Sequence, residues 1–166
     1  MKEPPQARSP NPELQALEKL FREALPGLEI ETSSNFDELV VTAAPQDIPA
    51  LCLAAKRDER LDFDYLRCLS AVEEDDQFSI VYHLRSTRKA HRAVLKTRVP
   101  RSQAVVASVT SVWRGADWHE REAAEMFGLE FRGHPHPAPL LLWEGFEEHP
   151  LRKDYPLGGR EGTGEG

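Results

Sequence analysis

The sequence predicts an α+β fold, a two-layer domain in which helices cover a mostly antiparallel four- to five-stranded sheet, followed by an irregular Pro-rich C-terminal arm. Apolar residues recur at helical spacing near the N-terminus, alternate with polar residues in the middle third, and give way to five prolines within 130–157. The 166 residues, 40% hydrophobic and 30% charged, suit one globular domain. We expect a flexible N-terminus over 1–12, the folded domain over 13–129, the arm over 130–157 and a disordered tail over 158–166.

Two helices and a hairpin are expected in the first third of the chain. Residues 14–25 place leucine and phenylalanine on one helical face and stop at a Pro-Gly pair, which is typical of a helix end. The short runs 28–31 and 39–43 predict two strands, with residues 32–35 as their turn. A second helix follows, with Asp47 as its expected N-cap.

The middle third predicts an antiparallel meander. Residues 66–72 are apolar enough for a largely covered strand, and the acidic run 73–76 is its expected turn. Polar and apolar residues then alternate over 78–85 and again over 92–99. This alternation predicts two strands that each bury one face and leave the other wetter.

The segment before the last helix is ambiguous. Residues 104–114 carry valines at helical spacing, but valine favours strands, and we expect an extended start with a short helix from Ser108. A better-defined helix follows, with Asp117 as N-cap, Glu120 completing a capping box and Gly128 just beyond its end. This helix closes the predicted domain.

Charge and cysteine content exclude several classes of partner. A net charge of −7 and a pI near 5.4 argue against nucleic acid or an anionic bilayer, since both require a basic surface. Cys52 and Cys68 lie in apolar runs without metal-binding spacing, which indicates reduced thiols and a cytoplasmic protein. The sequence contains no run long enough for a membrane span and no nucleotide-binding or nucleophile motif. Protein partners are therefore favoured, and membrane contact is expected only through them.

The last predicted helix concentrates charge on one face. At about 100° per residue, the charged face holds Trp118, Arg121, Glu122 and Glu125, opposite Ala123, Met126 and Phe127. Glu122 and Glu125 are three residues apart and repel each other unless a cation lies near them. Basic groups of a partner would supply that cation, and a solvated amphipathic helix is the simpler alternative. Acid–base catalysis by the carboxylate pair lacks a second site with defined spacing.

The histidines near the C-terminus raise the alternative of a zinc site. They are His119, His134, His136 and His149. Their spacing differs from zinc motifs, which place ligands a few residues apart on a rigid element. We expect His134 to order its loop through hydrogen bonds instead, and a small zinc hydrolase is the enzyme-class alternative.

A charged strap is expected at the end of the arm. Residues 150–157 alternate proline, apolar and charged side chains, so they cannot be helical throughout. Tyr155 and Leu157 are expected to anchor the strap. Paired, partly buried hydrogen bonds are expected from Arg152, Lys153 and Asp154.

Two motifs in this part of the chain occur in a fixed order. The first is Glu120-Arg121-Glu122-x-x-Glu125-Met126-Phe127-Gly128-Leu129-x-Phe131-x-Gly133-His134-Pro135, and the second is Gly145-x-x-x-His149-Pro150-Leu151-Arg152-Lys153-Asp154-Tyr155-Pro156-Leu157. Together they resemble the 30 kDa (C-type) subunit family of respiratory complex I, the NADH:quinone oxidoreductase. The resemblance extends more loosely back to about Leu61.

The resemblance implies a non-catalytic structural subunit in the peripheral arm of a proton-pumping enzyme. It implies an α+β fold with a C-terminal extension, no cofactor in this chain, and iron–sulfur clusters and FMN in partner subunits. The implied partners are the complex I subunits D (49 kDa), B and I, with the 49 kDa-type subunit beside the quinone module, on the cytoplasmic side of the inner membrane. The implied partner-binding residues are Glu120, Arg121, Glu122 and Glu125 on the helix, His134 in the loop, and Leu151, Arg152, Lys153, Asp154 and Tyr155 in the strap.

One stretch departs from the family pattern. Members usually carry an acidic residue after the His-Pro pair and a basic pair before the next aliphatic residues, whereas this chain has His136, Ala138 and Pro139 there. The alternative within the same class is the equivalent subunit of a membrane-bound hydrogenase or another ferredoxin-linked complex.

Overall fold

The structure, a computed structural model, describes residues 11–156 of the 166-residue chain. It has three α-helices: α1 (Pro12–Ala24), α2 (Ile48–Arg57) and α3 (Ala116–Phe127). The central sheet contains β1 (Ile30–Asn35), β2 (Glu38–Ala43), β3 (Tyr65–Glu74), β4 (Gln77–Arg85) and β5 (Arg92–Pro100). A 3-10 turn, η1 (Arg101–Gln103), leads to a small second sheet of β6 (Val105–Ala107) and β7 (Glu130–Arg132).

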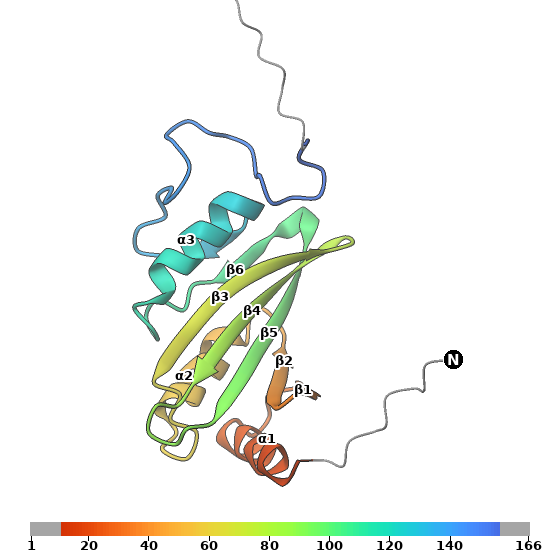
Figure 1. Ribbon diagram of the computed structural model, residues 1–166, viewed down its shortest axis with the longest axis vertical. Helices are drawn as coiled ribbons and strands as arrows, with labels where there is room; N and C mark the ends of the chain where they lie inside the picture. The colour runs from red at the N-terminus through yellow and green to blue at the C-terminus, as the bar shows by residue number, and fades with distance from the viewer. Residues whose placement is uncertain (1–10, 157–166) are drawn as a thin grey trace, which may run out of the picture.

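The five strands are arranged in the order β1-β2-β5-β4-β3 (Figure 1). The β1–β2, β4–β5 and β3–β4 pairs are antiparallel, and only the β2–β5 pair within this sheet is parallel. The predicted α+β class, with a mostly antiparallel sheet and covering helices, is therefore confirmed.

The core lies between one face of the sheet and the helices. The β4 residues that alternate inward are almost fully buried: Phe78, Ile80, Tyr82 and Leu84. Phe21 of α1 stacks on Phe63 with ring centroids 5.8 Å apart, and both are completely buried. Because a strand points successive side chains to opposite faces, the period-two pattern in the sequence predicted which side chains these are.

Both predicted hairpin turns are placed wrongly by the sequence. Residues 32–35 belong to β1, and the turn consists of Phe36 and Asp37. Likewise β3 runs through residue 74, and its turn is Asp75 and Asp76. Two-residue hairpin turns need positive φ angles, and Phe36 (53°) and Asp75 (39°) adopt them although neither is glycine.

The segment 104–114 is extended at its start, as predicted, but contains no short helix. Residues 105–107 form β6, which pairs in parallel with β7, and turns follow up to Gly115. The β-branched valines favour this extended form over a helix. The predicted capping box is also wrong, because α3 begins at Ala116 with Gly115 as its N-cap and no side-chain cap. Gly128 ends α3 in the left-handed conformation, as predicted.

The predicted terminal segments lie almost wholly outside the described residues. Asn11 and Pro12, which were assigned to the flexible N-terminus, instead form the N-cap and first residue of α1. The remainder of 1–12, the predicted tail 158–166 and the expected anchor Leu157 are outside the described range.

Candidate functional site

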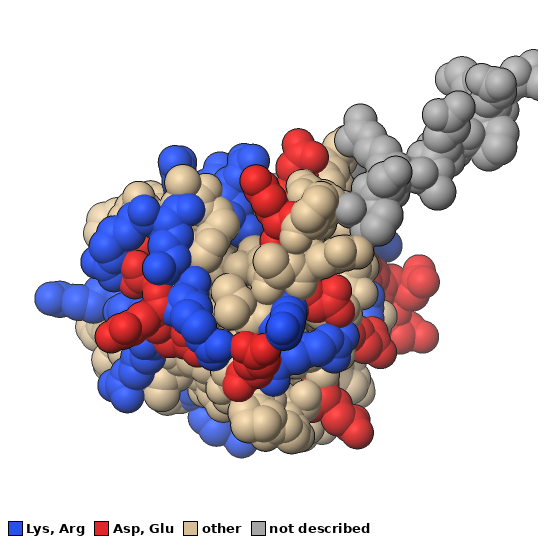
Figure 2. Space-filling model, turned by 90° about the horizontal axis from the view of Figure 1, so that it is seen from below, with Lys and Arg blue, Asp and Glu red and all other residues tan. Residues whose placement is uncertain are grey.

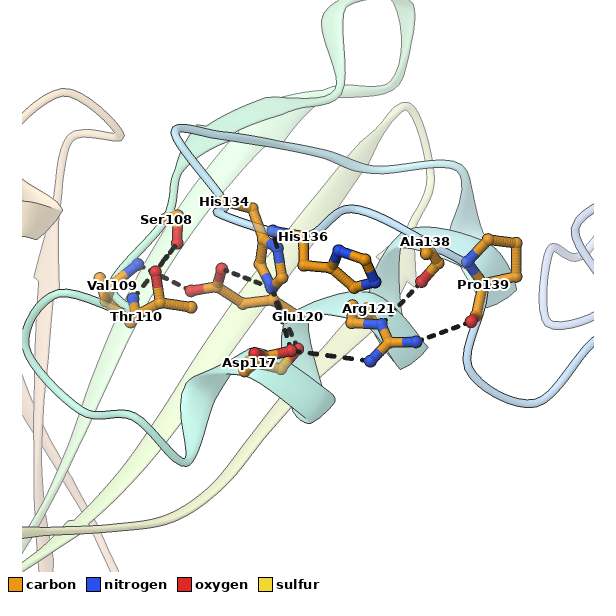
Figure 3. Close-up of polar contacts among 10 residues, drawn as sticks. All are labelled: Ser108, Val109, Thr110, Asp117, Glu120, Arg121, His134, His136, Ala138 and Pro139. Carbon is orange, nitrogen blue, oxygen red and sulfur yellow. Dashed lines mark hydrogen bonds and ion pairs between the residues drawn. The ribbon is translucent and has the colours of Figure 1, made fainter.

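Arg121 and Glu125 of α3 hold the C-terminal arm against the helix. The Arg121 guanidinium donates to the carbonyls of Ala138 (2.7 Å) and Pro139 (2.8 Å), as Figure 3 shows. One turn further, the Glu125 carboxylate accepts three consecutive backbone N–H groups at 3.0, 2.8 and 3.2 Å, those of Leu140, Leu141 and Leu142. Cationic donors thus meet carbonyls and an anionic acceptor meets amides, which are the stronger kinds of hydrogen bond. Arg121 and Glu125 therefore both bind backbone groups of the same chain.

The strap caps the C-terminus of α3. The last carbonyls of a helix have no partner within it. Here the carbonyl of Glu125 accepts from His149 Nδ1 (2.8 Å), and that of Met126 accepts from the Leu151 N–H (3.1 Å). The carbonyl of Phe127 accepts from Arg152 Nε (2.7 Å). A cation at this end of a helix is also favoured by the helix dipole.

Two further contacts make this cap tight. The Arg152 guanidinium lies over the Phe78 ring, 5.7 Å from its centroid. Gly128 has a φ of 71°, and a Cβ on it would overlap the ends of the Arg152 and His149 side chains, which would have to shift. Glycine adopts this φ without strain and leaves both side chains in place.

The end of the strap is tied to the sheet through a buried carboxylate. Glu73 of β3 is 6% exposed, pairs with Arg101 of η1 at 2.6 Å and accepts the Lys153 N–H at 2.6 Å. Arg101 also pairs with Asp154. Tyr155 is half-buried, and its N–H donates to the Arg152 carbonyl. Nothing in the sequence of β3 marked Glu73, because it was assigned to a turn.

Glu120 is buried, although the family resemblance implies that it binds a partner together with the charged residues of α3. Its side chain is fully enclosed, and Oε1 accepts the Val109 N–H at 2.7 Å. It shares the buried side of α3 with Ala116 and Ala123, four residues before and three after it, so helical spacing directs it toward the core. Burial raises the pKa of Glu120, against hydrogen bonds from Ser108 and Val109 that lower it.

His134 lies beside Glu120 and orders the loop after β7 (Figure 3). Its Nδ1 accepts the His136 N–H at 3.0 Å, so in a neutral ring the proton is on Nε2. Nε2 then donates to the Asp117 carbonyl at 3.1 Å. It is also 3.6 Å from Asp117 Oδ1 and 4.0 Å from Glu120 Oε2. Both of these oxygens are buried and make no hydrogen bond with a described residue.

Several large apolar side chains of the arm and α3 remain exposed. Leu141 (62%), Trp143 (69%) and Leu151 (55%) lie on the arm, and Trp118 (67%) lies on α3. Trp143 meets Phe146 edge to face at 4.6 Å, which fixes its ring. Glu122 is exposed too, without a hydrogen bond or ion pair to residues 11–156. The arm's apolar content was visible in the sequence, but only the contacts show which of its residues point outward.

A cavity of about 540 Å³ lies between α3, β7 and the arm. Its apolar lining includes Leu129, Phe131, Leu142 and Phe146. The four histidines that raised the alternative of a zinc site do not form one with each other in the described chain: within residues 11–156, no three His, Cys, Asp or Glu side chains are placed to hold a metal ion. In the same range no helix is both long and apolar enough to cross a membrane.

Comparisons with known sequences agree with the motifs. Residues 41–161 match the family described as the respiratory-chain NADH dehydrogenase 30 kDa subunit. The second of two C-type NADH-quinone oxidoreductase subunits of Rhizobium meliloti (strain 1021) is 42% identical over 118 residues, 69% of this chain and 64% of the relative. The C-type subunit of Roseiflexus castenholzii is 38% identical over 141 residues, 83% of this chain and 81% of the relative. The chain therefore spans less than two thirds of the Rhizobium protein.

Solved structures share the fold. A chain of the membrane-bound sulfane sulfur reductase (MBS), an archaeal respiratory membrane complex, superposes with a TM-score of 0.74 over 87% of this chain and 86% of that one, at 22% identity. The trypsin-resistant fragment (1-134) of Nqo5 superposes with a TM-score of 0.57 over 74% of this chain and 96% of that one, also at 22% identity. From the family match and the identity to C-type subunits, this chain belongs to the 30 kDa subunit family of respiratory-chain NADH dehydrogenase.

Proposed function

We propose that this chain is a non-catalytic structural subunit in the peripheral arm of a proton-pumping NADH:quinone oxidoreductase. Its C-terminal arm docks on the 49 kDa-type subunit next to the quinone module, with subunits B and I as further neighbours, on the cytoplasmic side of the membrane. The redox cofactors, iron–sulfur clusters and FMN, belong to those partners. The role of this chain is to fix their relative positions.

One observation carries this proposal: one set of side chains holds the arm in place, and another set remains exposed on it. Arg121, Glu125 and Arg152 direct their charges to backbone groups of the same chain, so they build the arm. The same contacts hold Leu141 and Trp143 outward, at 62% and 69% exposure. Rigidly presented aromatic and aliphatic side chains are the usual anchors of a protein interface, whereas an unbound surface rarely exposes them together.

The proposed docking residues therefore differ in part from those that the sequence predicted. Leu151 and Tyr155 keep a direct docking role, as do Glu122 and Lys153, which are both exposed. The other charged members of the predicted set act indirectly, because they set the position of the arm. His134 belongs to that indirect group, through its bonds to residues 117 and 136.

Replacing the two exposed anchors tests the proposal. We expect the double substitution Leu141→Ser and Trp143→Ser to reduce the amount of the 49 kDa-type subunit that copurifies with this chain by about tenfold or more. NADH:quinone activity of the membranes should fall with it. The matched control is Leu53→Ser. Leu53 lies on α2, outside the arm, and is 37% exposed. Normal copurification with the double variant, or quinone reductase activity in the isolated chain, would contradict the proposal.

The same purification distinguishes a respiratory enzyme from a hydrogenase-type complex. A flavin-bearing NADH module in the native complex supports the respiratory enzyme. A nickel–iron subunit in its place identifies a hydrogenase-type complex, and zinc that stays bound to the isolated chain would revive the hydrolase alternative.

A further inference from the structure

The face of the sheet that points away from the helices is exposed in part. On β5, Ala93 and Leu95 face the core, whereas Arg92, Val94, Lys96 and Arg98 alternate outward. Val94 (7%) and Ser79 of β4 (0%) are buried on this outer face. The outward residues Arg92 and Arg98 keep 48% and 43% of their side chains exposed. On β3, which is separated from β5 by β4, Val72 is 48% exposed on the same face. A surface of this kind is available to a partner.

Three arginines, Arg67, Arg85 and Arg92, lie at one end of this outer face. The strand register places Arg85 of β4 directly opposite Arg92 of β5, and like charges in that position destabilise a sheet. An irregularity in the register between residues 66 and 68 gives Arg67 of β3 an extra position in its strand. A single carboxylate, Glu38, lies 3.7 Å from Arg67 and 3.7 Å from Arg92. Arg85 has no ion pair with any residue of 11–156.

Two exposed aromatic side chains flank the arginines. Tyr65 is paired with Arg85 in the register and is 53% exposed. Phe36, in the β1–β2 turn two residues before Glu38, is 85% exposed and has a φ of 53°. Arginine and tyrosine are among the residue types that contribute most binding energy at protein interfaces. The β1–β2 turn holds Phe36 in solvent although its positive φ is strained. Such strain is typical of functional positions and also indicates a role in binding.

The arginine cluster is more basic than the molecule as a whole. The chain carries −7 overall, whereas the cluster holds three arginines and one glutamate, with Asp37 next to Phe36 and Asp64 next to Tyr65 in the chain. The β4–β5 turn lies at the lower left of Figure 1, and Figure 2, which views that end, shows Lys and Arg gathered on the left and Asp and Glu more frequent on the right. An acidic partner is attracted here, while the rest of the surface repels an anionic membrane or a nucleic acid.

We infer that Phe36, Tyr65, Arg67, Arg85 and Arg92 form a second docking site, which binds an acidic segment of a neighbouring protein. The carboxylates of that segment pair with the arginines, and its apolar side chains contact the two aromatic rings. The site is at the opposite end of the sheet from the strap, which contacts Glu73 and Arg101. It is therefore independent of the proposed docking through the arm, and a chain with both sites joins two neighbours.

Photo-crosslinking in the native complex tests the site. The crosslinking amino acid p-benzoylphenylalanine replaces Phe36 or Tyr65, one at a time, and the crosslinked peptide is identified by mass spectrometry. We expect a segment of another protein that is rich in Asp and Glu. The double substitution Arg85→Glu and Arg92→Glu should lower the crosslink yield by about tenfold or more. The control Lys19→Glu with Arg57→Glu makes the same charge change on exposed residues of α1 and α2 and should leave the yield unchanged.

The other outcomes overturn the inference. Crosslinks to lipid, to a second copy of this chain or to a segment without acidic residues would each show a different occupant. Absence of crosslinks from both positions, while the same amino acid at Trp143 crosslinks to a neighbour, would show that this end is bare in the complex. Crosslinks from Phe36 and Tyr65 but none from Trp143 would instead count against docking through the arm.

Discussion

The sheet with its helices and the C-terminal arm are held in place by different forces. The sheet side is apolar: α2 buries Ile48 and Leu51 completely against strands whose inward residues are also buried. The arm is fixed chiefly by hydrogen bonds between side chains of one segment and backbone groups of another, such as those of Glu125 and Arg152. Apolar burial is spread over many residues, whereas the arm depends on a few polar ones.

This difference predicts how each region fails. Removing a core side chain weakens the whole cooperative unit, because every contact in a small domain supports the same folding transition. Removing one polar contact of the arm should release the arm locally and leave the domain folded, since such segments open with their own smaller free energies. Substitutions in the two regions therefore separate global from local stability.

The largest effect is expected from Phe21→Ala in the core. Phe21 is fully buried and stacks on Phe63, so truncation leaves a cavity and should lower the free energy of unfolding by about 3–5 kcal/mol. Urea denaturation followed by circular dichroism measures it. Sheet amides that exchange only through global unfolding should lose hydrogen-exchange protection by the same amount, whereas amides of the arm, which opens locally, should change less. An equal loss in both regions, or a loss confined to the arm, would contradict separate opening of the arm.

Glu125→Gln should produce the next largest effect, and a local one. A neutral amide presents one acceptor where the carboxylate receives the amides of residues 140–142, and we expect this stretch to lose about 2 kcal/mol of protection. Hydrogen exchange at these three amides reports the change, while the urea midpoint should move little. Glu122→Gln is the matched control, because Glu122 is on the same helix, is exposed and makes no hydrogen bond or ion pair with residues 11–156. A fall in global stability like that of the core variant would mean that the arm and domain fold as one unit.

Gly128→Ala should displace the strap. The left-handed φ of 71° costs an alanine about 1–2 kcal/mol, and its Cβ overlaps Arg152 and His149. Faster exchange of the Leu151 amide, which donates to Met126, would register the displacement. Gly115→Ala is the control, because that glycine has an ordinary φ of −63° and open space around it. Unchanged exchange at Leu151 would mean that the strap does not need the close approach.

The same contrast explains how much the sequence could predict. Helical and strand periods identify the layers and most core residues, because burial in regular elements repeats with the element. The partners of Glu125 and Glu73 lie about 15 and 80 residues away and follow no period, so no local pattern reveals them. The burial of Glu120 could have been predicted from the sequence, because its spacing from Ala116 and Ala123 places it on the buried face. Its charge suggested an exposed position, but the spacing is the better guide.

The smallest effect is expected from Glu120→Gln, at a residue where the core meets the arm. Glu120 is buried like a core residue. It also lies beside His134, which orders the loop after β7. Burial raises its pKa, so the folded state holds the proton more tightly than the unfolded state does. The stability from this group is complete below the ordinary value of 4.5 and is lost as pH rises through the raised pKa.

Glutamine does not titrate and can still accept the Val109 N–H, so it escapes that loss. Relative to wild type, the variant should gain unfolding free energy as pH rises, by less than about 1 kcal/mol because the carboxylate's stronger bond to Val109 offsets part of the burial cost. Urea denaturation at intervals between about pH 4 and about pH 8 measures the difference, with Glu122→Gln as a control that should show no trend. A difference that moves in favour of wild type with rising pH would mean that Val109 and the nearby His134 stabilise the ionised carboxylate more than burial disfavours it.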